Sequence, residues 1–263
     1  AMSIDRLDPR WCGGDLLLQI CADDPLVVSH AARVLLKNVR TLATERWRQA
    51  GFRTARGANA EGTTMRNLMG QVDGTVNPAP GTPDFDELVW DSGQSQPWLA
   101  GGTLMVIRRI GMNLDTWDQL VRQSKELTVG RRLDNGAPLN GKHETDPVDL
   151  SVMRDGIAVI PPDSHVALAH LREPQERFLR RGYNYDDPPA SGQTTNSGLI
   201  FAAYQRDIDR QFLPVQRRLA EFDALNRWST PIGSAVFVIP PGVPPGGYIG
   251  QQLLENPTTP APP

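Results

Sequence analysis

The most constraining feature of the sequence is an alternation of short apolar runs with stretches of helical periodicity from residue 103 onward. Apolar runs occupy residues 103–107, 199–204 and 235–239, at lengths typical of buried strands. After the first two runs, apolar side chains recur at three- and four-residue spacing, as on an amphipathic helix. They are Leu114, Trp117, Leu120 and Val121 in one stretch, and Ile208, Phe212, Val215, Leu219 and Phe222 in the other. This order predicts an α+β, ferredoxin-like layer of the split βαβ type.

The first part of the chain has a similar pattern followed by a long irregular segment. Residues 15–21 and 45–52 are predicted to form strands, and a helix is predicted to begin at Pro25 after two aspartates. Residues 56–83 are rich in Gly, Asn, Thr and Pro and have little periodicity. Long irregular segments inside compact proteins are usually functional or disordered.

Composition narrows the class of protein. The 39% hydrophobic content over 263 residues is enough for one large domain or two smaller ones. The formal net charge of -3 gives no single-sign field, so we expect neither nucleic acid nor a membrane as partner. Two cysteines are too few for a disulfide scaffold. No apolar run of about 18 residues occurs, so we expect no membrane span and no export signal, with cytoplasm and export both open as locations.

Candidate chemistry lies in two places. Glycines flank Asp73 in residues 70–75, although the spacing alone favours a turn in which Asp73 caps neighbouring amides. Of the four histidines, His30 falls in the first helix and His143 in a polar loop. His165 and His170 are five residues apart, which is too far for two ligands on one helical face, so at most one of them should bind a metal.

Several segments together resemble a known family. Residues 66–75 read Arg-Asn-Leu-Met-Gly-Gln-Val-Asp-Gly-Thr, residues 163–166 Asp-Ser-His-Val, and residues 178–185 Phe-Leu-Arg-Arg-Gly-Tyr-Asn-Tyr. Residues 204–207 (Tyr-Gln-Arg-Asp) and the closing segment 233–242 follow. This order is similar to that of dye-decolorizing peroxidases, and the Arg-Arg-Gly-Tyr version resembles the bacterial deferrochelatase/peroxidase-like branch. The resemblance covers most of the chain, from about Asp8 to Gly242.

The resemblance implies a fold of two ferredoxin-like halves that holds haem b (iron protoporphyrin IX) mainly in the second half. On this basis residues 1–60 are a partial N-terminal ferredoxin-like domain and residues 61–97 a distal haem loop and linker. Residues 98–250 are the C-terminal haem-binding domain, and residues 251–263 are a disordered, Pro-rich tail.

The resemblance also assigns site residues. His165 is the implied iron ligand, with His170 as a secondary candidate, while Asp73 and Arg180 are the implied catalytic pair on the peroxide side. Phe201 is expected near the same face, where it would exclude water, or as a plain core residue. Asp223 is our candidate for the acid that receives the other ring N–H of the ligand, and an ordinary acid near a helix end is an equally good interpretation. One departure is Ala167, where the family usually has an arginine.

The implied activity is that of a haem peroxidase. Such an enzyme reduces hydrogen peroxide through a high-valent iron-oxo intermediate and oxidises dyes, phenols or other organic electron donors. A distal carboxylate beside an arginine stays ionised in mild acid, so we expect activity to favour acidic pH. The alternatives are a haem-handling, deferrochelatase-like protein and a specialised biosynthetic haem oxidase on the same scaffold.

The front of the chain departs from the family pattern. The family's first domain normally begins with another strand-helix-strand unit, and residues 1–14 are too short to supply it. We therefore expect an exposed apolar edge that is covered in a homo-oligomer or by a second chain completing the domain. The alternative is a reduced domain whose own helix covers the edge.

Overall fold

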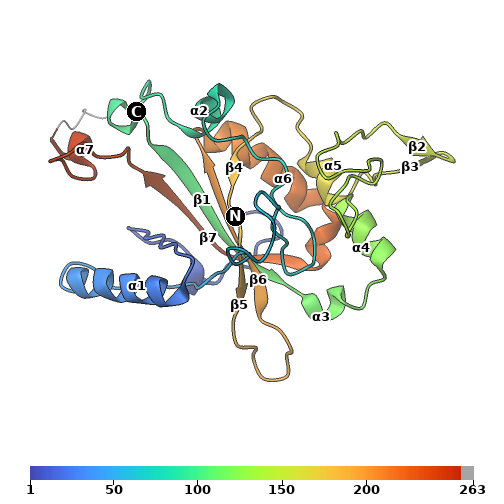
Figure 1. Ribbon diagram of the computed structural model, residues 1–263, viewed down its shortest axis with the longest axis horizontal. Helices are drawn as coiled ribbons and strands as arrows, with labels where there is room; N and C mark the ends of the chain where they lie inside the picture. The colour runs from blue at the N-terminus through green and yellow to red at the C-terminus, as the bar shows by residue number, and fades with distance from the viewer. Residues whose placement is uncertain (256–263) are drawn as a thin grey trace.

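The computed structural model describes residues 1–255, and its centre is one antiparallel sheet built by residues 103–239 (Figure 1). Its three long strands are β1 (Thr103–Met112), β6 (Ser197–Gln205) and β7 (Ser229–Ile239). Two short strands, β4 (Leu179–Arg180) and β5 (Tyr183–Asp186), both pair with β6. The strand order is β4-β6-β1-β7, with β5 also alongside β6.

The helices between these strands complete the predicted ferredoxin-like order. α3 (Leu114–Trp117) and α4 (Arg122–Val129) follow β1, while the π-helical η3 (Ile208–Phe212) and α6 (Leu213–Phe222) lie between β6 and β7. The first long strand, β1, lies in the middle of the sheet, between β6 and β7. The predicted fold class is therefore confirmed. In the stretch 114–121, which the sequence predicts as one helix, only Leu114–Trp117 is helical, as α3. The next helix, α4, begins after the stretch, at Arg122, because the backbone of Val121 is extended.

Shorter elements fill the remaining described chain. They are η1 (Pro9–Trp11), α1 (Pro25–Val39), α2 (Pro83–Val89), η2 (Pro97–Leu99), β2 (Met153–Arg154), β3 (Ile157–Ala158), α5 (His165–Ala169), η4 (Ala224–Arg227) and α7 (Gln251–Glu255). The tail expected to be disordered from residue 251 instead begins with the short helix α7, in which the Gln251 N–H donates to Tyr248 O and the Leu254 N–H donates to Gly250 O. The rest of that tail, residues 256–263, lies outside the described residues.

The main core lies where α3, β1 and β6 meet. Trp117 is fully buried there, and its ring packs edge-on against Trp228 with the ring centroids 5.4 Å apart. Met69 and Leu199 belong to the same cluster, which brings the irregular loop before α2 against the sheet. Packing of large apolar side chains thus fixes the position of a loop that has no regular structure of its own.

The first part of the chain differs from the sequence prediction. Residues 15–21 and 45–52 do not form strands; only Phe52 makes an isolated bridge, to Asn184 of β5. The expectation fails because a strand needs a hydrogen-bonded neighbour along its length, which the described residues do not give either segment. The predicted helix does form as α1, with Asp24 accepting from the backbone N–H of Leu26, but none of its residues is buried.

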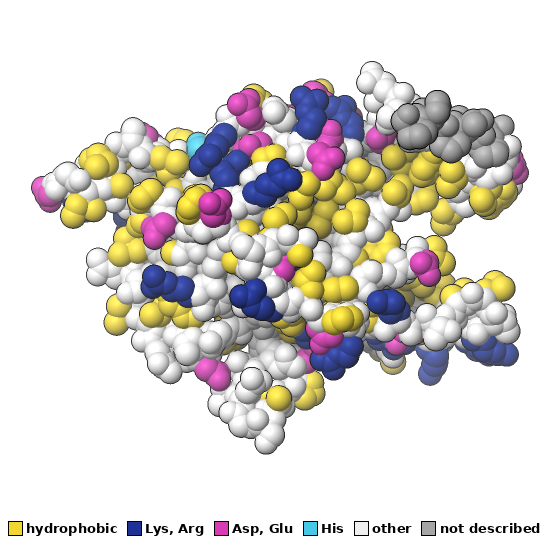
Figure 2. All heavy atoms as spheres, turned by 180° about the vertical axis from the view of Figure 1, so that it is seen from behind, with side chains coloured by type: hydrophobic (Ala, Val, Ile, Leu, Met, Phe, Trp, Pro, Cys, Tyr) yellow, Lys and Arg dark blue, Asp and Glu magenta, His cyan; other side chains and the backbone are white. Residues whose placement is uncertain are grey.

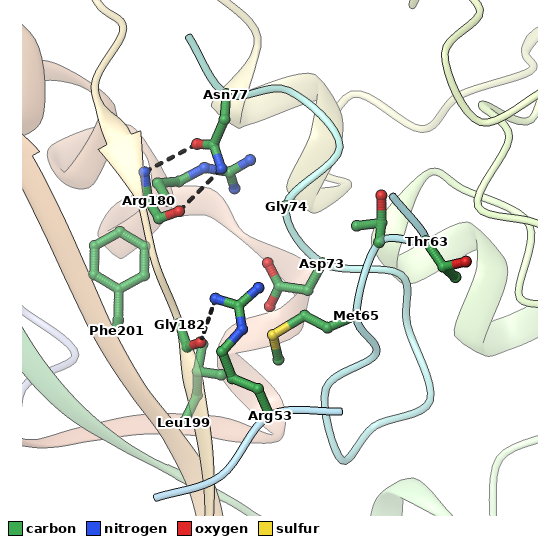
Figure 3. A pocket seen from close by; sticks show the side chains of 11 residues that line it. Arg53, Thr63, Met65, Asp73, Gly74, Asn77, Arg180, Gly182, Leu199 and Phe201 are labelled. Carbon is green, nitrogen blue, oxygen red and sulfur yellow. Dashed lines mark hydrogen bonds between the residues drawn. The ribbon is translucent and has the colours of Figure 1, made fainter. Parts of the chain in front are cut away.

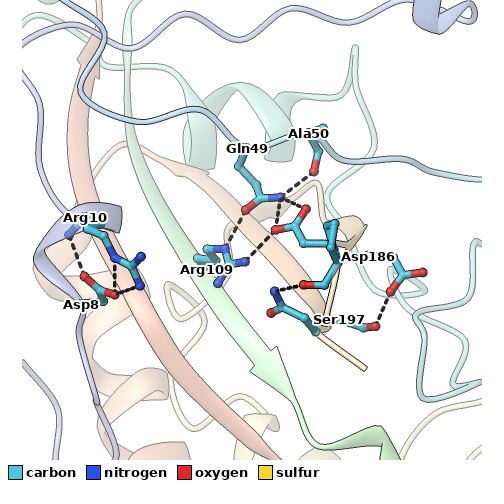
Figure 4. A network of polar contacts seen from close by, with 10 residues as sticks. Asp8, Arg10, Gln49, Ala50, Arg109, Asp186 and Ser197 are labelled. Carbon is cyan, nitrogen blue, oxygen red and sulfur yellow. Dashed lines mark hydrogen bonds and ion pairs between the residues drawn. The ribbon is translucent and has the colours of Figure 1, made fainter. Parts of the chain in front are cut away.

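Two sets of contacts dock this first part onto the sheet. The backbone N–H groups of Arg6 and Asp8 donate to carbonyl oxygens of β7, each at 2.9 Å. Arg109 of β1, which is 7% exposed, lies between the rings of Trp11 and Tyr185, at 4.4 and 4.1 Å from their centroids. Its guanidinium also donates to Gln49 Oε1 at 2.6 Å and to Asp187 Oδ2 at 2.9 Å (Figure 4).

Apolar side chains remain exposed on several parts of the molecular surface. Hydrophobic atoms gather on the side of the molecule that carries α7 (Figure 2). Leu16 and Leu42, on either side of α1, are 82% and 87% exposed, and Val236 on the edge strand β7 is 58% exposed. Across residues 1–255, no helix has the length and apolar character that a bilayer crossing requires.

Candidate active site

One cavity lies beside β4, β5 and β6, on the face of the sheet that the loop around residue 73 covers (Figure 3). Four separate parts of the chain line it. The lining residues are Arg53, Thr63, Thr64, Met65, Asp73, Gly74, Asn77, Arg180, Gly182, Leu199 and Phe201. Three of the predicted site residues, Asp73, Arg180 and Phe201, are therefore brought together in one place.

The loop that carries Asp73 folds back on itself like a small hairpin. Arg66 pairs with Val72, and the Asp73 backbone N–H donates to Met65 O at 2.8 Å. Gly74 has a φ of +118°, a conformation that a residue with a Cβ rarely adopts. Tight backbone pairing and this glycine turn the chain sharply immediately after Asp73.

The side chain of Asn67 organises the interior of this loop. Its Oδ1 accepts from the backbone N–H groups of Met69 and Gln71, at 3.0 and 3.3 Å. Its Nδ2 donates to Asp73 Oδ2 at 3.3 Å. Among the described residues, no backbone amide donates to the Asp73 carboxylate, so the expected role as a turn cap is not what the structure shows.

Three contacts fasten the loop to the rest of the molecule. Trp117 donates its indole N–H to Met69 O at 3.0 Å. Glu144 Oε1 accepts from the hydroxyl groups of Thr64 and Thr75, at 2.6 and 2.8 Å, and so joins the two sides of the loop. Because each contact uses a partly or fully buried group, the loop is held in one position.

Arg180 reaches the cavity from the short strand β4. Its backbone pairs with Ala203 of β6 on one side. On the other side, the side chain of Asn77 accepts from its backbone N–H and donates to its carbonyl oxygen, both at 2.9 Å. The guanidinium donates to Val76 O at 3.1 Å. Arg180 is therefore bound to the segment that directly follows Asp73.

His165 is the first residue of α5. The hydroxyl of Ser164, which is fully buried, donates to Pro161 O at 2.6 Å and caps the helix through the backbone N–H of Ala167. Gly130 ends α4 at a φ of +90°, and a Cβ there would lie 3.0 Å from the Ser164 hydroxyl. Only glycine lets α4 approach α5 this closely without a shift.

His165 and Asp223 form a hydrogen-bonded pair. His165 Nδ1 lies 2.6 Å from Asp223 Oδ2, while Asp223 Oδ1 accepts from the backbone N–H of Leu225 at 2.9 Å. The Asp223 side chain is 3% exposed and that of His165 is 33% exposed. With Nδ1 donating to the carboxylate, Nε2 is left as the ring nitrogen that carries a lone pair.

The charges around the site shift two ionisation equilibria. Burial on its own lowers the pKa of His165, but the charge of Asp223 and its hydrogen bond outweigh burial, so that this pKa is raised. The charge of Arg180 lowers the pKa of His165 and the charge of Asp73 raises it, each by less than Asp223 does. Burial and the nearby charge of Arg181 lower the pKa of Arg53.

The remaining candidates lie elsewhere. His170 follows α5 at its C-terminal end and is exposed. No group of three or more His, Cys, Asp or Glu side chains arranged to hold a metal ion occurs within residues 1–255. Arg53 and Asn77, which the sequence does not single out, also line the cavity. Asn77 could have been suspected from its place in the irregular segment, whereas nothing near Arg53 sets it apart.

Comparison with known proteins gives the same family from sequence and from structure. The Dyp-type peroxidase C-terminal family model matches residues 64–244, and the N-terminal model matches residues 1–53. A dye-decolorizing peroxidase from Thermobifida fusca is 44% identical over 97% of this chain and 60% of its own length. A deferrochelatase from Yersinia pestis is 38% identical over 95% of this chain and 59% of its own length. The chain thus spans about 60% of the length of the curated relatives it matches.

Solved structures agree with this. The DyP-type peroxidase from Cellulomonas bogoriensis superposes with a TM-score of 0.93 at 52% identity, over 97% of this chain and 71% of that one. Ferric DtpA from Streptomyces lividans superposes with a TM-score of 0.93 at 39% identity, over 97% and 70% of the two chains. With a family model over more than half of its residues and the same fold around the cavity, the chain belongs to the Dyp-type peroxidase family.

Proposed function

We propose that the chain binds haem b with His165 as the iron ligand. The observation that carries this proposal is the His165–Asp223 pair, since a buried carboxylate on Nδ1 orients the ring and leaves Nε2 as a neutral donor of the kind haem iron takes. The donor set fits the group, because haem iron takes a single protein nitrogen of this kind and no cluster of three or more His, Cys, Asp or Glu side chains that could hold a metal ion instead occurs within residues 1–255. We further propose residues 61–97 as the distal loop and residues 98–250 as the haem-binding domain.

The proposed activity is that of a haem peroxidase that uses hydrogen peroxide and an organic electron donor such as a dye or a phenol. Bound haem would supply an iron with one open position at which peroxide can be reduced. The Asp73 carboxylate would take a proton from peroxide and return it to the oxygen that leaves as water. Arg180 would donate hydrogen bonds to the same oxygen and stabilise the charge that develops on it. Phe201 would limit the access of water to this side of the cavity.

The proposal is tested by reconstitution with haem. The parent protein should bind one equivalent and give a ferric spectrum, and His165→Ala should abolish stable loading or change the spectrum. His170→Ala is the matched control, because this exposed histidine lies at the other end of the same helix. If His165→Ala keeps the parent spectrum while His170→Ala loses it, the ligand assignment is wrong.

Rapid mixing of the loaded protein with peroxide tests the activity itself. The spectrum of the parent should change within seconds of mixing and return to its resting form when a phenol is added. A loaded protein whose spectrum peroxide leaves unchanged would refute the peroxidase proposal.

The deferrochelatase relatives favour a second candidate function. At 38% identity over nearly the whole chain, they support a haem-handling role in which haem or its iron is released without peroxide turnover. Release of iron-free porphyrin from the loaded protein in the absence of peroxide, seen by its fluorescence, would favour this role over the peroxidase.

We also propose that a second copy or a separate polypeptide covers the exposed apolar residues of the N-terminal segment. The support for this is the exposure of Leu16 and Leu42 together with a helix α1 that buries none of its residues. Exposed apolar surface of this kind favours association in water.

A further inference from the structure

We infer that Asn77 is a positioning residue for Arg180: its side chain replaces a missing neighbouring strand and holds the distal arginine in register beside Asp73. The inference rests on the proposed function, because it assigns Asn77 a role in the reaction for which Arg180 is proposed. Asn77 carries no charge and does not belong to the predicted set of site residues.

The backbone of Arg180 shows why such support is needed. β4 consists of two residues only, Leu179–Arg180, and it pairs with β6 on one side. On its other side no strand follows in the described part of the sheet. A two-residue edge strand next to a cavity has few hydrogen bonds of its own to fix its position.

Asn77 supplies hydrogen bonds on that side. Its Oδ1 accepts from the Arg180 N–H and its Nδ2 donates to the Arg180 carbonyl oxygen, both at 2.9 Å (Figure 3). This pair of bonds uses both backbone groups of one residue, as a neighbouring strand would. An asparagine amide is suited to the task because it carries a donor and an acceptor on one short, planar group.

The same segment also holds the Arg180 side chain. The guanidinium donates to Val76 O at 3.1 Å, so backbone and side chain of Arg180 are both bound to residues 76–77. Asp73 lies only a few residues earlier in that segment, directly before Gly74. A Cβ added to Gly74 would lie 4.0 Å from Asn77 Nδ2. A shift of Asn77 would therefore change the position of Arg180 relative to Asp73, and displacements of about 1 Å can cost roughly a hundredfold in rate.

The test compares Asn77→Ala and Asn77→Asp with the parent. Asn77→Ala removes both hydrogen bonds, whereas Asn77→Asp keeps the acceptor for the Arg180 N–H and loses the donor. Amide hydrogen exchange of residues 178–182 in the haem-free protein should accelerate in Asn77→Ala by roughly tenfold or more, and less in Asn77→Asp. The matched control is Asn196→Ala, which removes an amide that donates to a loop carbonyl, Pro188 O, at 3.1 Å and should leave this segment unchanged.

The second measurement uses the haem-loaded proteins. The rate of reaction with peroxide should fall by roughly tenfold or more in Asn77→Ala with haem still bound, and Asn77→Asp should restore part of it. If Asn77→Ala does not fold, Asn77→Asp takes its place: partly faster exchange together with a partly slower peroxide reaction would support the inference, and no change in either would overturn it. Unchanged exchange, or faster exchange with an unchanged peroxide rate, would overturn the inference. A parent that binds haem but does not react with peroxide would instead refute the proposed function, and the exchange data would then show whether Asn77 holds Arg180.

Discussion

Trp117 donates its indole N–H to the carbonyl oxygen of Met69 at 3.0 Å, and both side chains are buried. The bond joins a side chain of the helical layer to the loop that carries Asp73, a segment with almost no regular structure. The position of Asp73 therefore depends on the hydrophobic core beneath it as well as on hydrogen bonds within the loop.

Substitution Trp117→Phe should destabilise the protein and loosen this loop. The change leaves a buried carbonyl oxygen without its donor, which costs about 1–3 kcal/mol in the free energy of unfolding. Urea denaturation measures the loss. Trp98→Phe is the control, because its indole N–H donates to Gln96 in an exposed contact; equal stability of the two variants would contradict the importance of the Met69 bond.

Asp223→Asn should weaken haem retention without preventing folding. The amide keeps the size of the carboxylate but loses the charge that raises the pKa of His165 and orients its ring. Loss of such a carboxylate partner typically costs tenfold to a hundredfold in metal affinity. Competition for haem with an apo-globin measures the change, and parent-like retention would show that Asp223 is not the partner that tunes the ligand.

Arg180→Leu and Asp73→Asn should each slow the reaction with peroxide by roughly a hundredfold or more while haem stays bound. Since the two side chains would act on the same oxygen atoms, the double variant should be little slower than the slower single variant. Stopped-flow rates for the parent, the two single variants and the double variant complete the double-mutant cycle. Fully multiplicative effects would mean that the two residues act independently.

The pair Glu176–Arg218 should make the protein sensitive to acid. Arg218 donates to Glu176 at 2.7 and 2.9 Å and also to Leu168 O, so the pair holds the end of α5 against α6. The hydrogen bonds from Arg218 lower the pKa of Glu176 in the folded state below its value in the unfolded chain. The stabilisation is thus complete above the unfolded pKa of about 4.3 and is lost as pH falls through the folded value.

Glu176→Gln should therefore cost roughly 2 kcal/mol in the free energy of unfolding at neutral pH, and the difference from the parent should shrink below about pH 4. Urea denaturation over this pH range is the measurement. Asp84→Asn is the matched control, since it removes an exposed ion pair with Arg177 and should change stability by less than about 0.5 kcal/mol.

The exposed apolar residues beside α1 should cause the chain to associate. Light scattering should show a dimer or larger species in the micromolar range, and the double substitution Leu16→Lys with Leu42→Lys should reduce the observed mass. Ile157→Lys is the control, because Ile157 is 72% exposed on the β2–β3 hairpin. A parent protein that stays monomeric, with its first segment resistant to proteolysis, would contradict the proposed association.

The sequence predicts the sheet better than it predicts the first segment or the site. The long strands are found because their apolar runs are buried against α6 and the core, so that pattern and environment agree. Residues 15–21 have a similar pattern but no strand beside them, and pattern alone does not report whether a partner is present. Motifs in the sequence make Asp73, Arg180 and His165 candidates for the site, whereas Arg53 and Asn77 reach the cavity through positions that only the folded chain brings together.

The contacts of Arg6 and Asp8 with β7 have a consequence for the order in which the molecule assembles on the ribosome. Their partners lie at Pro231 and Ile232, more than roughly two hundred residues later, and Arg109 must be in place before Trp11 and Gln49 can close around it. At ordinary rates of synthesis the early segment waits roughly 10 to 45 seconds for the strand that receives it. This early segment is thus placed only after β7 has been made, and Leu16 and Leu42 stay open to other nascent chains during that interval.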